Sequence, residues 1–282
     1  MLLFSALVAG SFSLGGLAAN LLDPAALNAI RFLIACVVIG ALGIATGAFR
    51  AADRAAPWRY AVLGVLFASY FVLMFEGLKT APPVSAAAVF TLTPVMAAGF
   101  GWLLMRQVTS AWMAAALALG ATGALWVIFR ADLAALLAFE VGRGEATYFV
   151  GCIAHAAYTP LVARLNRGEN PISFTFGMLV AGTLFLFALG APALAATEWR
   201  ALPPIVWITI AYTALAASAA TFVLLQYATL RLPSAKVMAY TYLTPSWVIL
   251  WQIALVAEFP PLAILGGVAI TIAALLMLLR SA

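Results

Sequence analysis

VFTLTPV at residues 89–95 and YTYLTPS at residues 240–246 are the two stretches that decide the fold. The first lies within an apolar run at residues 82–105 and the second within one at residues 237–257, and neither run contains a charged residue. A helix of about 20 apolar residues spans the roughly 30 Å hydrocarbon core of a bilayer. The sequence therefore predicts two membrane-spanning helices, each with a Leu-Thr-Pro motif near the bilayer midplane.

Each motif places a proline in the interior of its helix. Pro94 and Pro245 have no backbone N–H, so the carbonyls of Phe90 and Thr241 lose their helical hydrogen-bond donors. In lipid, such a carbonyl needs a donor from a neighbouring helix, a hydroxyl or a water-filled cavity. Because the two breaks occupy matching positions, we expect a cavity at the centre of a repeat protein. Kinks buried against dry neighbours would argue against this hypothesis.

Composition places the chain among multi-pass membrane proteins. Of its 282 residues, 66% are hydrophobic and only 8% are charged, with a mean hydropathy of +1.13. A soluble domain of this length exposes far more polar surface. Two cysteines, Cys36 and Cys152, and one histidine do not form a metal-binding motif, so we expect no metal and no cofactor. The net charge of +5 comes from short loops and gives no reason to expect a nucleic-acid partner.

Charges, prolines and glycines divide the chain into ten apolar spans. The first span lacks the basic region of a cleaved signal peptide, because the first Lys or Arg is Arg31, so we interpret it as a retained helix. The predicted spans are residues 2–20, 24–47, 58–78, 82–105, 109–129, 144–164, 171–194, 203–230, 233–257 and 260–280.

Basic residues outside the spans predict the orientation. With the N-terminus inside, nine of them fall in cytoplasmic segments and four in outside segments, with Arg31 left out as intramembrane. This bias predicts both termini in the cytoplasm of a bacterial-type inner membrane. The nine are Arg50, Arg54, Arg59, Arg106, Arg164, Arg167, Arg231, Lys236 and Arg280, and the four are Lys79, Arg130, Arg143 and Arg200.

The two halves of the chain match when one is shifted by 151 residues, which places residues 92–94 on residues 243–245. Each half has five spans, an odd number, so the second half enters the membrane in the opposite orientation. We predict an all-α membrane protein with ten transmembrane helices in two inverted five-helix repeats around a central cavity. The repeats are residues 1–130 and 144–282, joined by a periplasmic loop at 131–143. A chance match between Ala/Leu-rich helices is the alternative.

Polar and aromatic residues near the midplane are the candidate substrate ligands. In the ninth span, a rotation of about 100° per residue places Thr241, Tyr242, Pro245 and Gln252 on one face, which we orient towards the cavity. An ionisable group at this depth, such as His155, is costly and indicates function, although packing explains any single residue equally well. The candidate ligands are Tyr70 in the third span, Phe90, Thr91 and Thr93 in the fourth, His155 and Tyr158 in the sixth, and Tyr242 and Gln252 in the ninth. Pro94 and Pro245 are the candidate helix-break or gating residues.

Four charged residues are candidates for coupling or for the rim of the pathway: Arg31, Glu76, Lys79 and Glu258. Arg31 lies about two turns into the second span, where its side chain can reach the outer headgroups or stay within the bundle. Glu76 and Lys79 are spaced i, i+3, and we expect them to form an ion pair. The chain has no Gly-x-Ser-x-Gly, no His-Glu-x-x-His and no phosphate-binding loop, so we do not expect an enzyme.

The ordered set of these motifs resembles the EamA type of the drug/metabolite transporter superfamily, over essentially the whole chain. The motifs that carry the resemblance are TLTP (91–94), YLTP (242–245), AAYTPLVARL (156–165), VAEFP (256–260) and Pro24 followed by Arg31. Within the superfamily, LFASYFVL (66–73) and VMAYTYLTP (237–245) are most similar to the YddG-type amino acid exporters.

This resemblance implies a basket-shaped bundle with a central cavity, export of a solute to the periplasm, and a pocket at positions matched by Tyr70, Thr91, Thr93 and His155. The threonines stand where exporters that favour aromatic amino acids carry aromatic residues, which implies a broader amino acid range.

We therefore expect alternating-access export of amino acids, aromatic and other, or of similar small metabolites. Multidrug or other metabolite efflux is the nearest alternative, ahead of an ion channel or a non-transporting scaffold. A ten-helix bundle can enclose a pathway alone, so a monomer in the lipid bilayer is sufficient. Proton antiport would use His155, Glu76 or Glu258, whereas facilitated uniport needs none of them.

Overall fold

The computed structural model describes residues 1–138 and 140–280, and in this part of the chain every regular element is a helix. Residue 139 of the predicted connecting loop and residues 281–282 of the predicted second repeat lie outside the described residues. The first half contains α1 (Leu2–Ala18), α2 (Pro24–Ala45), η1 (Ala51–Arg54), α3 (Trp58–Leu78), α4 (Pro83–Phe90), α5 (Thr93–Met105) and α6 (Ala111–Ile128).

The rest of the chain begins with α7, a short helix inside the predicted connecting loop, where the sequence had predicted none. The elements are α7 (Leu133–Ala138), α8 (Arg143–Leu165), α9 (Pro171–Ala196), η2 (Trp199–Ala201), α10 (Pro204–Ala214), the π-helix η3 (Leu215–Ala220), α11 (Thr221–Thr229), α12 (Ser234–Ala239), η4 (Tyr240–Leu243), α13 (Thr244–Val256) and α14 (Leu262–Arg280).

Helices occupy all ten predicted ranges, with ends that differ by a few residues. Among the described residues, eight helical stretches are long and apolar enough to cross a membrane. The 17-residue α1 is shorter, and residues 234–256 are divided among α12, η4 and α13. The described part of the chain is therefore all-helical with eight candidate membrane spans, and the number of ten crossings stays a prediction.

The first proline break satisfies its own freed carbonyl. The Thr93 hydroxyl donates a hydrogen bond of 2.5 Å to the Phe90 carbonyl, which is the one that Pro94 leaves without a helical donor. The Thr91 hydroxyl donates in the same way to the Ala88 carbonyl at 2.6 Å. One of the three kinds of donor expected from the sequence is therefore present, and it is local, so this break does not require a water-filled cavity.

The second break is closed by a change of helix type. Residues Tyr240–Leu243 form a 3₁₀ turn. The backbone N–H of Thr244 donates to the Thr241 carbonyl, which receives no hydrogen bond from Pro245 because proline has no N–H. A 3₁₀ turn rotates the chain by about 120° per residue instead of about 100°. The prediction that Thr241, Tyr242 and Gln252 share one face assumed an uninterrupted α-helix and is therefore wrong.

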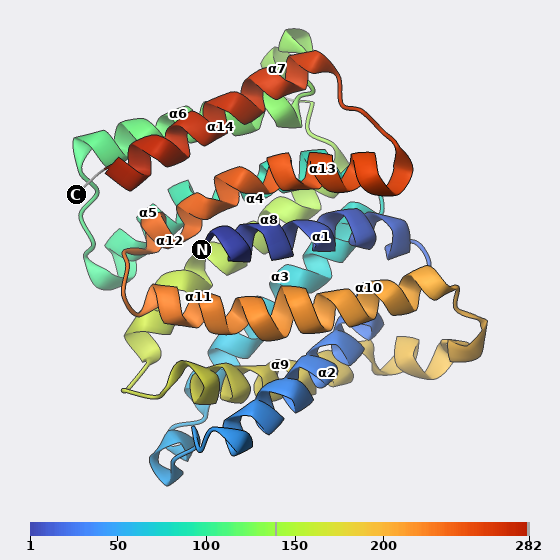
Figure 1. The fold of residues 1–282 in the computed structure, drawn as a ribbon, viewed down its shortest axis with the longest axis vertical. Coiled ribbons are helices and arrows are strands. Elements are labelled where there is room, and N and C mark those ends of the chain that lie inside the picture. The colour runs from blue at the N-terminus through green and yellow to red at the C-terminus, as the bar shows by residue number, and fades with distance from the viewer. Residues whose placement is uncertain (139, 281–282) are drawn as a thin grey trace.

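Figure 1 shows α1, α10, α11 and α13 running across the view, with α2, α3 and α8 crossing them obliquely and both ends of the described chain at the same end of the bundle. α6 packs against α14 at one edge, and α2 packs against α9 at the opposite edge. α3 contacts α8 in the interior, where α1 contacts α10 and α13. α2 and α9, like α6 and α14, occupy equivalent positions in the two predicted repeats. The inverted relation between the halves stays a prediction.

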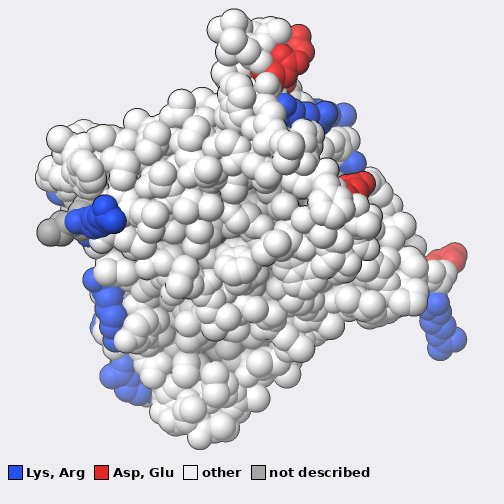
Figure 2. All heavy atoms as spheres, turned by 45° about the horizontal axis from the view of Figure 1, so that its top comes forward, with Lys and Arg blue, Asp and Glu red and all other residues white. Residues whose placement is uncertain are grey.

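Charge is segregated along the helix direction. In Figure 2, Lys and Arg side chains lie along the left edge, and both basic and acidic side chains lie at the top and along the right edge. The surface between these edges carries no charged side chain on the face shown. Exposed large apolar residues such as Val37, Leu184 and Leu250 cover the long helices between their ends. A charge-free apolar belt of this kind fits the hydrocarbon layer of a bilayer.

Candidate functional site

One face of α3 carries the aromatic residues at the centre of the bundle. Phe67, Tyr70, Phe71 and Met74 follow the i, i+3, i+4, i+7 spacing that places side chains on one side of a helix, and all are buried. The Tyr70 and Phe71 ring centroids lie 4.6 Å apart in an edge-to-face arrangement, and those of Phe67 and Phe71 lie 5.1 Å apart. α3 therefore supplies a preformed aromatic wall.

Residues from the other half of the chain complete the site. His155 of α8 lies with its ring centroid 4.5 Å from that of Tyr70 and 5.4 Å from that of Phe90. Phe222 of α11 lies 4.5 Å from Phe67. We call Phe67, Tyr70, Phe71, Phe90, His155 and Phe222 the central aromatic cluster; it joins the two halves of the protein.

The central aromatic cluster surrounds a cavity of about 10 Å³. This is room for about one water molecule, whereas a site for a small organic ligand usually occupies about 300 Å³ or more. The sequence predicted an open chamber here, and the structure corrects that expectation: the rings fill the space between the halves. The remaining lining consists of Phe4, Val8, Ser11, Met74, Ala217 and Thr221.

Two polar atoms at this cavity have no hydrogen-bond partner among the described residues. They are Nδ1 of His155 and Oγ of Ser11, both buried. A buried polar group without a partner costs about 1–3 kcal/mol. The two atoms therefore mark the part of the closed site where a hydrogen bond to a polar ligand group or a water molecule would lower the free energy most.

Arg31 lies beside the central aromatic cluster, fully buried. Its guanidinium carbon is 3.7 Å from the centroid of the Phe71 ring. Nε donates to Ser218 Oγ at 2.7 Å, Nη2 to the Ala217 carbonyl at 3.0 Å, and Nη1 to Asn28 Oδ1 at 3.4 Å. The interpretation that Arg31 extends to the outer headgroups is therefore wrong, because acceptors inside the bundle hold its guanidinium.

The π-helix η3 provides two of these acceptors, Ala217 and Ser218. A π-helical turn interrupts the regular hydrogen-bond ladder of an α-helix, and such turns occur frequently at functional sites. None of the ion pairs within the described part of the chain involves Arg31. Its charge therefore lies inside the bundle without a carboxylate partner.

The predicted ligands around the first break separate into two groups. Tyr70, Phe90 and His155 line the cavity, and the hydroxyls of Tyr70 and Tyr148 are 2.9 Å apart. Tyr158 stacks on Phe67 with centroids 4.3 Å apart but does not line the cavity. Its hydroxyl accepts a hydrogen bond from Gln226 at 2.9 Å. The Thr91 and Thr93 hydroxyls are bonded to backbone carbonyls of their own helix, as described above.

Tyr242 and Gln252 lie away from the cavity. Tyr242 packs in a separate hydrophobic cluster against α6 and α14, with its ring over Gly120. Gln252 lines a second cavity of about 350 Å³ between α4 and α13, together with Glu258, Arg130 and Ser85. The structure therefore does not bring Tyr242 together with Phe90, because the 3₁₀ turn redirects its side chain.

The second break nevertheless has free hydrogen-bonding capacity. Four hydroxyls around Pro245 have no partner among the described residues: those of Thr241, Tyr242, Thr244 and Ser246. The threonines of the first break are satisfied by carbonyls, so the two breaks differ in what they can offer to a ligand.

The remaining charged candidates lie at an end of the helices. Lys79 Nζ and Glu76 Oε2 form the predicted ion pair at 2.7 Å, with both side chains partly exposed. Glu258 is exposed at the second cavity. The sequence did not single out Phe67, Phe71, Phe222 or Ser218. The spacing of Phe67, Phe71 and Met74 around Tyr70 is a signal that identifies one face of α3, whereas Ser218 has no comparable signal.

Helices alone among the described elements, eight of them long and apolar enough to span a membrane, are typical of a polytopic membrane protein. The model of the EamA-like transporter family matches residues 1–129 and 142–280. The protein therefore belongs to the EamA family and is a transporter of small metabolites in a lipid bilayer.

Two known proteins are similar to this chain. An "Uncharacterized transporter YyaM" from Bacillus subtilis (strain 168) is 24% identical over 213 residues, which cover 75% of this chain and 70% of that protein. A solved crystal structure, described only as that of a protein, matches with a TM-score of 0.71 and 20% identity. The match covers 98% of this chain and 94% of the other and supports the fold alone. Neither description specifies a solute.

Proposed function

We propose that this EamA-family protein exports amino acids, or similar small metabolites that carry a carboxylate, by alternating access. The observation that carries the proposal is Arg31, a buried cation beside the central aromatic cluster with no acidic partner. An uncompensated charge inside a membrane bundle is costly, and such residues mark substrate or ion pathways. A solute carboxylate supplies the missing negative charge.

The position of Arg31 supports a direct role in recognition. Phe71 and Ala217 contact Arg31 and also line the central cavity, so the guanidinium lies directly behind the cavity wall. A guanidinium binds a carboxylate through two parallel hydrogen bonds. The Ser218 and Ala217 contacts would be exchanged for the carboxylate when the site opens.

The central aromatic cluster supplies the contacts for the rest of the solute. Tyr70 and Phe90 present ring surfaces to the cavity, and the unpartnered His155 Nδ1 and Ser11 Oγ offer polar contacts. This combination suits a small zwitterion with a side chain of variable size, and it agrees with the broad amino acid range expected from Thr91 and Thr93.

Transport requires the closed cavity to expand. Pro94 divides one predicted span into α4 and α5, and Pro245 divides another into α12 and α13. The two divided spans pack against each other, α4 on α13 and α5 on α12. Each break is a site where the half-helices can bend. The free hydroxyls of the second break would be satisfied by solute or water in the open states. In this mechanism, two inverted repeats alternately open the central site to each side of the inner membrane, with both termini in the cytoplasm.

Multidrug efflux remains the alternative function, and Arg31 argues against its commonest substrates. Lipophilic drugs that are cationic would meet a buried positive charge without an anion to balance it. A carrier for neutral or cationic drugs is therefore the less favoured interpretation, although the aromatic lining alone would accommodate either class.

Counterflow into proteoliposomes tests the proposal. Vesicles preloaded with an unlabelled amino acid should accumulate the labelled form in a saturable manner, and the matching amine without the carboxylate should compete at least about tenfold more weakly. Saturable flux of the amine with no flux of any amino acid would overturn the carboxylate assignment. Repeating the measurement with an imposed pH gradient distinguishes proton antiport from facilitated uniport.

A further inference from the structure

A large cavity among the described residues lies outside the central site. It has a volume of about 600 Å³ and is formed where the α2–α3 connection crosses α9, at the same end of the bundle as the two chain ends (Figure 1). Sites for small organic ligands commonly occupy about 300–1,000 Å³. Nothing in the proposed transport cycle uses this cavity, and we call it the α9 cavity.

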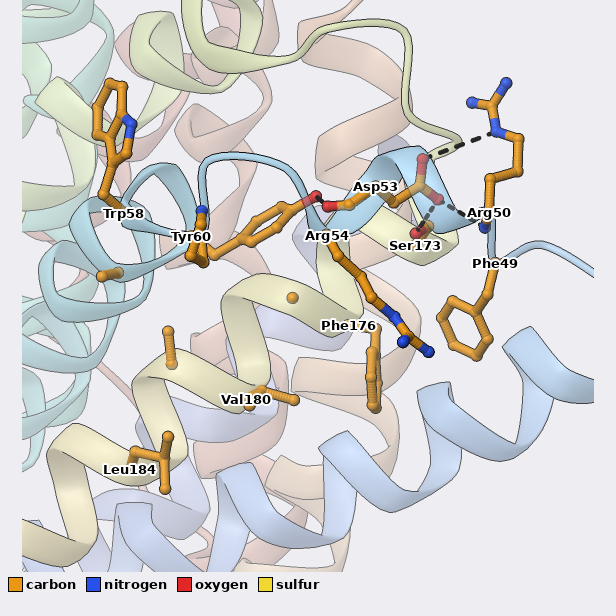
Figure 3. A pocket seen from close by; sticks show the side chains of 14 residues that line it. Phe49, Arg50, Asp53, Arg54, Trp58, Tyr60, Ser173, Phe176, Val180 and Leu184 are labelled. Carbon is orange, nitrogen blue, oxygen red and sulfur yellow. Dashed lines mark hydrogen bonds and ion pairs between the residues drawn. The ribbon is translucent and has the colours of Figure 1, made fainter.

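The α9 cavity is polar at one end and apolar along its length. η1 contributes Asp53 and Arg54 to the polar end, where Ser173 at the start of α9 also lies. Phe176, Val180 and Leu184 follow along one face of α9 and form the apolar part (Figure 3). A ligand that fills the cavity therefore has a polar head and an apolar tail, which is the form of a membrane lipid.

Hydrogen bonds hold the polar end in place. Asp53 Oδ2 accepts from Ser173 Oγ at 2.6 Å and from the Arg50 backbone N–H at 3.1 Å. The Tyr60 hydroxyl donates to the Asp53 carbonyl at 2.6 Å, and Arg50 Nη2 donates to the Gly168 carbonyl at 2.6 Å. The carboxylate of Asp53 is thus already satisfied by the protein, and the connection is tied to α9.

Arg54 is the polar group that remains available. It has no ion pair with any other described residue, and Figure 3 shows its side chain extending from η1 across the cavity towards Phe176. Arg50 and Arg54 together outweigh the one carboxylate at this end, so the polar end has a formal charge of +1. A guanidinium is a strong partner for a phosphate group.

The apolar part faces outwards. Leu184 is 68% exposed and Trp58, which also lines the cavity, is 54% exposed. Tryptophan near the end of a membrane helix is typical of the headgroup region, and basic residues beside a span attract anionic lipids. The cavity therefore opens to the depth at which a lipid headgroup meets its acyl chains.

We propose that the α9 cavity binds an anionic phospholipid, with its phosphate on Arg54 and one acyl chain along Phe176, Val180 and Leu184. The lipid fastens the α2–α3 connection to α9. This site is independent of the transported solute, so the inference does not rest on the amino acid assignment.

Brominated lipids that quench tryptophan fluorescence test this proposal, because Trp58 lines the cavity. The protein is reconstituted in phosphatidylcholine with increasing fractions of brominated phosphatidylglycerol, and the signal of a Trp58→Phe variant is subtracted to isolate Trp58. We expect saturation at a low fraction of the anionic lipid. Brominated phosphatidylcholine should quench only in proportion to its abundance.

Variants separate the headgroup contribution from the chain contribution. Arg54→Gln should weaken the apparent affinity for phosphatidylglycerol about fivefold, and Val180→Phe, which narrows the apolar part without adding a tryptophan, should weaken it without a change of charge. Arg167→Gln removes an exposed arginine at the same end that does not line the cavity, and it should leave the affinity unchanged.

The proposal would be overturned by equal quenching by both lipids at every fraction, by unchanged affinity in Arg54→Gln, or by a loss in Arg167→Gln as large as in Arg54→Gln. Glycerol phosphate, which carries the headgroup chemistry without chains, should not compete with the lipid. Full competition by glycerol phosphate would assign the site to a soluble phosphate compound instead.

Discussion

Arg31 Nε donates a hydrogen bond of 2.7 Å to Ser218 Oγ, a residue 187 positions further along the chain. The contact joins α2 of the first half to the π-helix of the second half, next to the central aromatic cluster. Both side chains are fully buried. A charge that is held by hydroxyl, carbonyl and amide oxygens alone is available to a stronger acceptor, and this property generates the first prediction.

Substitution of Arg31 should separate carboxylate solutes from other solutes. Arg31→Gln removes the charge and should lower kcat/KM for an amino acid by at least about tenfold, with a much smaller effect on a neutral solute of similar size. Arg31→Lys keeps the charge without the two-pronged geometry and should recover part of the loss. Initial rates of counterflow measure the effect, with Arg167→Gln as a control. Equal losses for both solutes would show that Arg31 acts in folding alone.

The Thr93 hydroxyl should matter only because Pro94 is present. Thr93→Val leaves the buried Phe90 carbonyl without a donor and should lower the free energy of unfolding by about 1–3 kcal/mol, whereas Thr93→Ser keeps the donor. In a Pro94→Ala background, the restored N–H can take over the carbonyl, and the effect of Thr93→Val should shrink. Denaturation of the four proteins in a double-mutant cycle measures the coupling. An identical effect in both backgrounds would contradict this account of the break.

Close packing of α3 on α8 depends on Gly77. A Cβ atom at this position would lie 2.7 Å from the Gly144 carbonyl oxygen and 2.9 Å from Tyr148 Cβ. Gly77→Ala should therefore separate the helices and destabilise the protein by about 1–3 kcal/mol. Gly99→Ala is the matched control, because a Cβ atom there meets nothing within 4 Å. The thermal midpoint in detergent should fall for the first variant and stay constant or rise for the second.

The Arg59–Glu169 ion pair predicts a pH dependence of stability. The two side chains are 1% and 3% exposed, and Arg59 Nη2 lies 2.6 Å from Glu169 Oε1. Burial would raise the pKa of Glu169, but hydrogen bonds from Arg59 and from the Arg167 backbone N–H outweigh it and hold the pKa below its ordinary value. Because the folded pKa is lowered, the contribution to stability is present above the unfolded pKa of about 4.3 and is lost as pH falls through the folded value.

Glu169→Gln should consequently lower the thermal midpoint at neutral pH, by an amount corresponding to roughly 3 kcal/mol for a broken buried pair. The difference from the wild type should stay constant down to about pH 4.3 and shrink below it. Glu198→Gln changes an exposed carboxylate outside these ion pairs and should have little effect at any pH. A difference that widened as pH fell would reverse the sign of this argument.

Local patterns were sufficient to predict the long helices and their proline breaks, although not the short α7. Apolar runs longer than a bilayer crossing leave little choice but a helix, because lipid offers no partners for the backbone. Pro94 and Pro245 interrupt those helices wherever they pack, since a proline has no N–H to donate. The i, i+3 spacing of Glu76 and Lys79 likewise predicted their ion pair from sequence distance alone.

The candidate site was predicted only in part, because its geometry depends on contacts between distant segments. Tyr70 and His155 were identified by polarity and depth, and Phe90 by the face of the fourth span that carries Pro94; the three do lie together. Tyr242 was placed with them on the assumption of a regular α-helix, which a 3₁₀ turn replaces. The predicted chamber is filled by rings such as Phe67 and Phe222, which apolar composition does not distinguish from other core residues.

The sequence by itself determined that this chain is a membrane protein of long helices with two proline breaks, because hydrophobic length and missing N–H groups act locally. Only the tertiary structure decided that Arg31 is buried against the π-helix at Ser218, that the centre is closed, and that Arg54 extends across a cavity on α9. These features depend on which side chains from separate helices fill the same space, and close packing settles that for the bundle as a whole.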